Sequence, residues 1–178
     1  MKLIKLLPVF LVLVFASCST VRVVSDYDSE VNFNQYTSFA FYKPGIDKAK
    51  ISDLDKRRIL KAIESELSAK AMSKSETPDL LVSIFTKEQE RVNVYNNNFG
   101  MGWGWNPYWS GGQYGRSVSR TTEGTLYIDL IDAKTNNLVW QGIGTSSLIT
   151  NNVEKKEARI KEIVREIMTK YPPGLAKN

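Results

Sequence analysis

The segment near the C-terminus restricts the fold most, because its apolar residues all fall on one face of a helix. They recur at intervals of three and four residues: Ile160, Ile163, Val164, Ile167, Met168 and Tyr171. Pro172-Pro173-Gly174 then ends the helical pattern. A helix with one apolar face must cover another element, so this segment requires a partner surface.

A second amphipathic helix is expected in the middle of the first half of the chain. Ser52 is a good N-cap, and Asp55 follows three residues later, close to the spacing of a capping box. The expected apolar stripe consists of Ile59, Leu60, Ile63 and Leu67. This helix also needs a surface to cover.

Strand patterns account for most of the remaining chain. The expected strands cover residues 21–24, 38–42, 79–85 with an extension to 95, 121–132 and 138–148. The nearly continuous apolar run 79–85 is typical of a strand covered on both faces. Lys43-Pro44-Gly45 is expected to be a turn, and residues 73–75 an exposed loop.

These elements predict an α+β two-layer sandwich. The expected order is strand, strand, helix, three strands, helix, with two helices on one face of a mixed or antiparallel sheet of about five strands. A length of 178 residues suits one domain, and the sequence contains no internal repeat or interdomain linker. We expect this domain to span residues 21–173, with a C-terminal tail at 174–178.

The first eighteen residues have the pattern of an export signal. A short basic start precedes an almost wholly apolar run from Leu6 to Ala16, which is too short for a membrane span of about 20 residues. Ser17 and Cys18, the only cysteine, follow directly. This segment resembles the lipobox of bacterial lipoproteins, which predicts a signal peptide at 1–17, cleavage between Ser17 and Cys18, acylation of Cys18, and a lipidated tether at 18–20.

Resemblance to lipoprotein sorting signals favours the outer membrane of a Gram-negative bacterium, with the domain facing the periplasm. Ser19 follows the cysteine and no acidic cluster comes after it. Loss of Lys2 and Lys5 with the signal leaves a net charge of +3, which is mild. We therefore expect membrane attachment through the lipid and no nucleic-acid partner.

The composition argues against familiar catalytic sites. The chain has no histidine, which excludes Ser-His-Asp catalysis and His-ligated metal sites, and one cysteine cannot form an internal disulfide. We expect no enzymatic activity and no cofactor or metal. Two carboxylate pairs, Asp26 with Asp28 and Asp129 with Asp132, have the chemistry of acid–base or cation sites, but aspartates at strand ends are commonly turn residues.

The segment 96–116 is unusual, because three of the four tryptophans and six of the eleven glycines lie in it. Long loops of this kind are usually functional or disordered. Its aromatic residues suit contact with a sugar ring, a membrane interface or a protein partner. The contact residues proposed are Trp103, Trp105, Tyr108 and Trp109. The alternative is a hairpin tip whose rings fold back over the sheet edge.

Several motifs resemble a family of bacterial lipoproteins, DUF4136. They are Val24-Ser25-Asp26-Tyr27-Asp28, Ser38-Phe39-Ala40-Phe41, Pro78-Asp79-Leu80-Leu81-Val82, Ile128-Asp129-Leu130, Leu138-Val139-Trp140 with Gly142, and Tyr171-Pro172-Pro173. The resemblance covers roughly residues 21–173. It implies a periplasmic lipoprotein with no established biochemical activity and supplies no site residues.

Three classes of function remain open on this basis. The first is a non-catalytic binding or scaffold module of the cell envelope, with an envelope protein as partner. The second is a glycan- or peptidoglycan-binding lipoprotein that uses the aromatic loop. The third, ranked last, is a hydrolase with a carboxylate pair, which needs two carboxylates about 5–10 Å apart in an open cleft.

Overall fold

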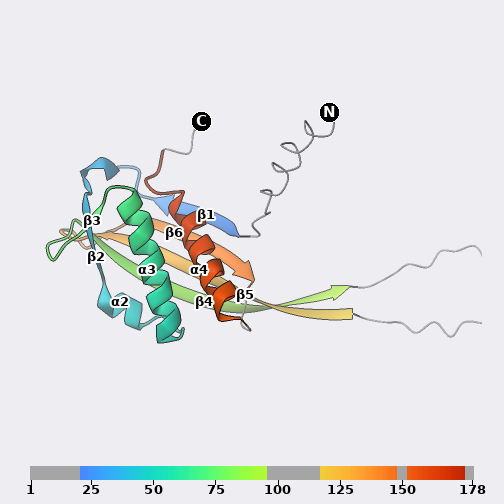
Figure 1. Cartoon of the computed structure of the whole chain (residues 1–178). Coiled ribbons are helices and arrows are strands. Elements are labelled where there is room, and N and C mark those ends of the chain that lie inside the picture. The colour runs from blue at the N-terminus through green and yellow to red at the C-terminus, as the bar shows by residue number, and fades with distance from the viewer. Residues whose placement is uncertain (1–20, 96–116, 148–151, 175–178) are drawn as a thin grey trace, which may run out of the picture.

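The computed structural model describes residues 21–95, 117–147 and 152–174 (Figure 1). These residues form a six-stranded sheet with two long helices on one face, so the α+β sandwich is confirmed with one strand more than expected. The strands are β1 (Arg22–Tyr27), β2 (Ser38–Phe41), β3 (Ser73–Lys74), β4 (Leu80–Tyr95), β5 (Ser117–Asp132) and β6 (Leu138–Ser147). The helices are α2 (Lys43–Asp47), α3 (Asp53–Ala69) and α4 (Val153–Met168), with a 3-10 turn at Phe33–Gln35.

The sheet is mixed, as expected, and its strand order is β1-β6-β5-β4-β2-β3. The β1–β6, β6–β5 and β5–β4 pairs are antiparallel, whereas β2 is parallel to both β4 and β3. The β4–β5 ladder runs without interruption from Leu80 opposite Asp132 to Tyr95 opposite Ser117. Its outer part extends past the helices (Figure 1).

Two short elements differ from the sequence-based expectation. The expected turn at Lys43-Pro44-Gly45 is the start of α2, where proline lacks only an N–H that has no partner in a first helical turn. The expected loop at 73–75 contains β3, because the chain returns from α3 alongside β2. The Ser73 amide donates to the carbonyl of Thr37 at 3.0 Å.

Helix α3 begins at the cap that the sequence predicts, and both long helices bury most of the predicted apolar side chains. The Ser52 hydroxyl accepts a hydrogen bond from the Asp55 amide at 3.2 Å, and the Asn152 side chain does the same for the Lys155 amide at 2.8 Å. The buried residues of α3 are Ile59, Ala62, Ile63 and Leu67, and those of α4 are Ile163, Val164, Ile167 and Met168.

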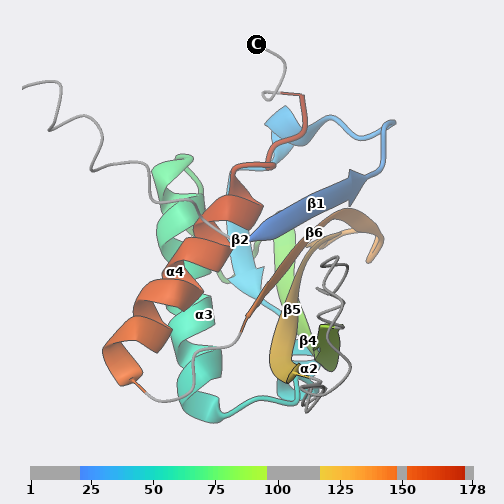
Figure 2. The ribbon, with the colours of Figure 1, turned by 90° about the vertical axis from the view of Figure 1, so that its right-hand side faces the viewer.

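The two helices lie over the same face of the sheet, as the view along the β4–β5 hairpin shows (Figure 2). The facing side chains of β4 and β5 are buried: Leu80, Val82, Ile84, Leu126, Ile128 and Leu130. The prediction that residues 79–85 are covered on both faces holds only in part. On the second face Ser83 is buried where Gly45 of α2 packs against its side chain, and Leu81 is half-buried, but Phe85 is 49% exposed.

Helix α4 packs directly on the backbone of β6, because two glycines face it. A Cβ atom at Gly144 would lie 2.7 Å from Cδ1 of Ile167 and 3.2 Å from Cγ2 of Ile163, closer than packed carbon atoms come. Gly142 meets the same helix in the same way. Trp140, two residues earlier on this face, is fully buried and belongs to the core.

Asp79 joins the starts of the two parallel strands β2 and β4. Its carboxylate accepts hydrogen bonds from the amides of Thr37 and Ser38 at 3.0 and 3.1 Å and from their hydroxyls at 3.2 and 2.8 Å. These donors, the Thr37 amide foremost, hold the pKa of Asp79 below its usual value. Asp79 therefore has a structural role, because it holds the first residues of β2 and β4 together.

The close approach of α4 to β6 makes a testable prediction about Gly144. Gly144→Ala should lower the free energy of unfolding by about 1–3 kcal/mol, because the added methyl group collides with Ile167. In the double variant Gly144→Ala/Ile167→Ala the loss should be smaller than the sum of the two single losses. Urea unfolding of all four proteins measures this coupling. Simple additivity would contradict the proposed contact.

Candidate functional site

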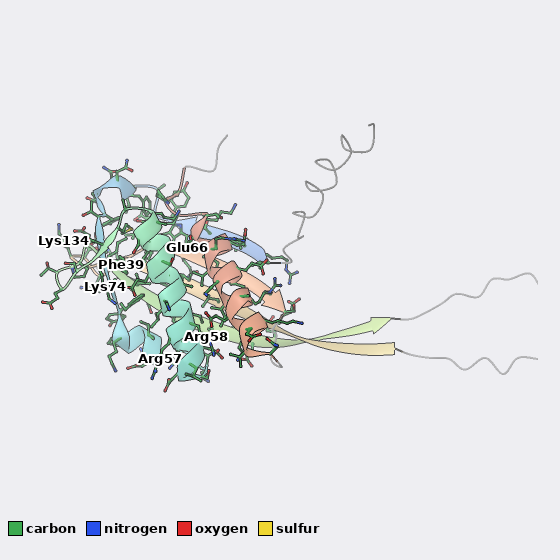
Figure 3. All side chains as sticks on the ribbon, in the orientation of Figure 1. Phe39, Arg57, Arg58, Glu66, Lys74 and Lys134 are labelled. Atoms are coloured by element: carbon green, nitrogen blue, oxygen red, sulfur yellow. The ribbon has the colours of Figure 1, made fainter. Side chains whose placement is uncertain are left out.

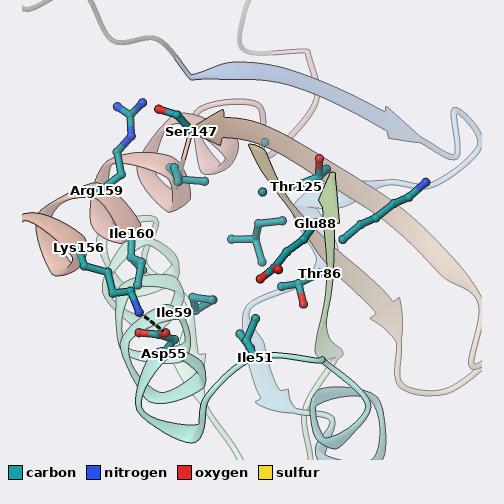
Figure 4. A pocket seen from close by; sticks show the side chains of 15 residues that line it. Ile51, Asp55, Ile59, Thr86, Glu88, Thr125, Ser147, Lys156, Arg159 and Ile160 are labelled. Atoms are coloured by element: carbon teal, nitrogen blue, oxygen red, sulfur yellow. Dashed lines mark hydrogen bonds and ion pairs between the residues drawn. The ribbon is translucent and has the colours of Figure 1, made fainter. Parts of the chain in front are cut away.

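A pocket of about 180 Å³ lies between the sheet and the first turns of α3 and α4 (Figure 4). Its floor comes from β4, β5 and β6, and its other side from the two helices and the segment before α3. Ile51, Ile59 and Ile160 reach toward it from these elements (Figure 4). The pocket therefore lies where the helices begin to cover the sheet.

The pocket interior is mostly apolar. Its apolar side chains are Ile51, Ile59, Leu126, Ile160 and Ile163. Gly124 and Gly144 on the floor contribute backbone only, and Thr86 is short. Gly124 and Thr86 carry little side chain to fill the volume under the helices, whereas Gly144 lies where α4 already packs closely on β6.

Charged side chains line the pocket beside α3 and α4, and the carboxylate among them on α3, Asp55, forms ion pairs. The carboxylate of Asp55 lies 2.8 Å from Nζ of Lys156 and 2.7 Å from Nη1 of Arg58. Burial alone would raise the pKa of Asp55, but the hydrogen bonds from Lys156 and Arg58 outweigh it and hold the pKa below its usual value. This bridge ties the starts of α3 and α4 together.

The arrangement suits binding of an apolar group more than bond-making chemistry. The interior offers isoleucine and leucine side chains, and the Asp55 carboxylate already accepts hydrogen bonds from two cationic side chains. In the described part of the chain no group of three or more His, Cys, Asp or Glu side chains could hold a metal ion.

Two of the sequence-predicted carboxylates are turn residues. Asp132 accepts hydrogen bonds from the amides of Lys134 and Thr135 at 2.8 Å each and from the Tyr36 hydroxyl at 2.9 Å. The hydrogen bond from the Thr135 amide contributes most to the lowered pKa of Asp132. Burial and then the Asp132 carboxylate raise the pKa of Tyr36 to about 12. Asp28 accepts from the Glu30 amide at 2.9 Å, so both aspartates close local turns.

The other two carboxylates share the face of the sheet opposite the long helices, but Gln141 separates them. Asp26 lies opposite Gln141, which in turn lies opposite Asp129, so the two aspartates are two strand spacings or about 10 Å apart. Nε2 of Gln141 donates to Asp129 at 2.7 Å. The structure therefore does not bring either predicted pair together around one reacting atom.

This open face also carries an apolar row that crosses four strands in register. Its members are Val24, Ile143, Tyr127 and Phe85. Val24 is 62% exposed, and the rings of Tyr127 and Phe85 lie 5.6 Å apart. Single exposed apolar residues are common, but a continuous row on a sheet is a typical contact surface.

The remaining predicted site residues lie outside the described residues. They are Ser17, Cys18, Trp103, Trp105, Tyr108 and Trp109. Segment 96–116 joins the far ends of β4 and β5. Within the described ranges no helix is both long and apolar enough to cross a membrane.

Sequence reasoning missed the pocket, although part of its signal was present. Ile59, Ile160 and Ile163 were assigned to helix faces that cover a sheet, and this is correct. Nothing in their spacing indicates that Gly124 and Gly144 would lie beneath them, because β5 and β6 meet the helices only in the folded chain. Gly124 pairs regularly with Glu88, and the register shift of β5 falls between Leu130 and Ile131.

Comparison with solved structures shows which proteins share this fold. The chain resembles a PDZ domain protein from Parabacteroides distasonis (TM-score 0.52, 16% identity), covering 86% of this chain and 36% of that one, so it spans about a third of that chain's length. It also resembles the PelC dodecamer from Paraburkholderia phytofirmans (TM-score 0.51, 11% identity), with 84% of this chain and 96% of that one covered. At these identities the likeness concerns the fold alone.

The sequence itself identifies the family. The profile described as "Domain of unknown function (DUF4136)" matches residues 23–173. The chain therefore belongs to the DUF4136 family, as its motifs predicted. A search of curated proteins gives no significant match.

The open face supplies a prediction about pH. Burial raises the pKa of Asp129, while the hydrogen bond from Gln141 opposes this effect, so the folded state disfavours the charged form. Asp129→Asn should raise Tm at pH 7 by about 1–3 °C. As pH falls through the raised pKa, the wild-type carboxyl also becomes neutral, and the two melting temperatures should converge.

Asp132→Asn is the matched control, because its effect on Tm at pH 7 should have the opposite sign. Its carboxylate has a lowered pKa, so it contributes stability above the unfolded value of about 3.9 and loses it in more acid solution. Asp132→Asn should therefore lower Tm at pH 7, and this difference should shrink below about pH 4. Calorimetry between pH 3 and pH 7 measures Tm for both variants and the parent protein. A lower Tm for Asp129→Asn at pH 7 would contradict the burial argument.

Proposed function

We propose that this protein is a lipoprotein of the bacterial envelope, anchored at the outer membrane by an acylated Cys18, with a non-catalytic periplasmic binding module. The observation that supports binding best is the apolar pocket, because the central carboxylate beside it is already paired. An apolar cavity of defined shape suits a ligand or a partner side chain.

The start of β1 supports the anchoring part of the proposal. Arg22 already lies opposite Thr145 in the sheet, so the domain begins within three or four residues of Cys18. Three residues span at most about 11 Å. A lipid on Cys18 would therefore hold the domain against the bilayer rather than on a long stalk.

The anchor is tested by mass spectrometry of the protein isolated from envelope membranes. We expect an N-terminus at Cys18 that carries a diacylglyceryl group and an amide-linked acyl chain, such as palmitate. Cys18→Ser should retain the mass of residues 1–17 and lack any acyl mass. An unprocessed N-terminus, or an unmodified Cys18 in the parent protein, would refute the anchor.

A second candidate function is binding of glycan or peptidoglycan. It is favoured by the concentration of tryptophan in segment 96–116 and by the hairpin of β4 and β5, which extends past the helices and carries this segment between its ends. Exposed aromatic rings stack on sugar rings. This alternative function would use segment 96–116 rather than the apolar pocket.

Cosedimentation with purified peptidoglycan tests this alternative. If segment 96–116 binds glycan, replacing all four aromatic residues by serine should abolish cosedimentation with peptidoglycan. The residues are Trp103, Trp105, Tyr108 and Trp109. The variant Tyr42→Ser/Phe85→Ser, which removes two exposed aromatic rings elsewhere, should pellet like the parent. Absence of pelleting in the parent protein would eliminate the glycan hypothesis.

A further inference from the structure

We propose that the pocket between α3, α4 and the sheet takes an acyl chain of an anionic phospholipid, and that this end of the molecule faces the bilayer. The inference rests on the proposed lipid anchor and adds a ligand class and an orientation to it. Three features of the described residues meet at this end of the molecule and support it.

The first feature is the entry of the chain. Val23 of β1 lies opposite Gly144, which forms part of the pocket floor, and Arg22 pairs with Glu123 at 2.9 Å, next to the floor residue Gly124. Chain that leads from Cys18 therefore joins the sheet beside the pocket. An acylated Cys18 would place this end within about 10 Å of the membrane.

The second feature is a pair of exposed apolar side chains at the helix starts. Leu54 in the first turn of α3 is 60% exposed, and Val153 in the first turn of α4 is 64% exposed. They do not line the pocket themselves, but they lie in the same first helical turns as Asp55 and Lys156, which do. Exposed apolar residues at the same end of the two helices suit contact with a lipid surface.

The third feature is the size and chemistry of the pocket. Its volume of about 180 Å³ compares with the roughly 150 Å³ of an engineered apolar cavity that binds benzene. It therefore suits a short segment of an acyl chain rather than a whole chain. Side chains of Ile59, Leu126 and Ile163 present aliphatic carbon to it.

Two exposed cations near the helix starts can meet an anionic headgroup, beside the acidic residues Asp53 and Glu154 of the same first turns and Glu88 at the pocket. Lys155, next to Lys156, and Arg57 on α3 are exposed, and neither forms an ion pair within the described residues. Arg57 and Arg58 lie toward the beginning of α3, whereas Glu66 lies toward its end (Figure 3). A phosphate in the headgroup layer can meet these cations while its acyl chain lies in the pocket.

Photolabelling tests the proposal with the full-length, lipidated protein in vesicles. The probe is phosphatidylglycerol with a diazirine near the end of one acyl chain, and adducts are located by mass spectrometry. We expect adducts in peptides that contain Ile59, Leu126 or Ile163. Because only the added phospholipid is photoreactive, its adduct mass distinguishes it from the acyl chains on Cys18.

Ile160→Trp fills the pocket and should reduce labelling of these peptides about tenfold. Ile143→Trp is the matched control, because Ile143 is also half-buried but lies on the opposite face of the sheet. It should leave labelling unchanged. Thermal unfolding of both variants verifies that each is folded, and Ile160→Phe, which fills less of the pocket, replaces Ile160→Trp if the latter does not fold and should reduce labelling to a smaller extent.

Three results would overturn the inference: equal labelling in Ile160→Trp and the parent, equal labelling by phosphatidylcholine with the same diazirine, or adducts confined to the open face around Ile143. The anchor is judged separately by the mass of Cys18 in the same sample. An acylated Cys18 with an unlabelled pocket refutes only the acyl site. A labelled pocket with an unmodified Cys18 refutes only the anchor.

Discussion

The structure depends on the packing of two one-sided helices against a single face of one sheet. Helix α4 can lie directly on β6 because Gly142 and Gly144 carry no side chains there. Ile163 and Ile167 then occupy space that a Cβ atom would take. This close packing aligns α4 with α3, and the Asp55–Lys156 bridge joins their first turns. The positions of the helix starts, and hence of the pocket, follow from it.

The cavity lies next to this close contact, at the edge of the helix layer. Toward the middle of the sheet, Ile128, Leu130 and Trp140 fill the layer between strands and helices. Toward the helix starts, Gly124, Gly144 and Thr86 form the floor, and the helices no longer meet bulky side chains from below. Because interiors are otherwise close-packed, a void of this size at the edge of the core is a natural place for an apolar ligand.

The two faces of the sheet differ in what they leave exposed. The helix face is buried over most of its length, whereas the opposite face displays Val24, Phe85 and the half-buried Asp129. Asp129 and Asp26 lie on this face with Gln141 between them, and Asp132 closes a turn. The carboxylates that suggested acid–base chemistry in the sequence thus have separate structural surroundings.

The sequence by itself determined the two long helices and their buried faces, the Ser52 cap, most strand positions and the family, because each depends on local periodicity or on motifs within one segment. Ser52 caps α3, and the helical repeat of residues 160–168 lies on the core as expected. Only the tertiary structure decided β3, the partly open second face of β4 and the pocket. Each of these requires segments far apart in the chain to meet: Ser73 beside β2, and Gly124 and Gly144 beneath Ile59 and Ile163. Contacts between distant segments leave no periodic signal, since they arise only when helices and strands pack.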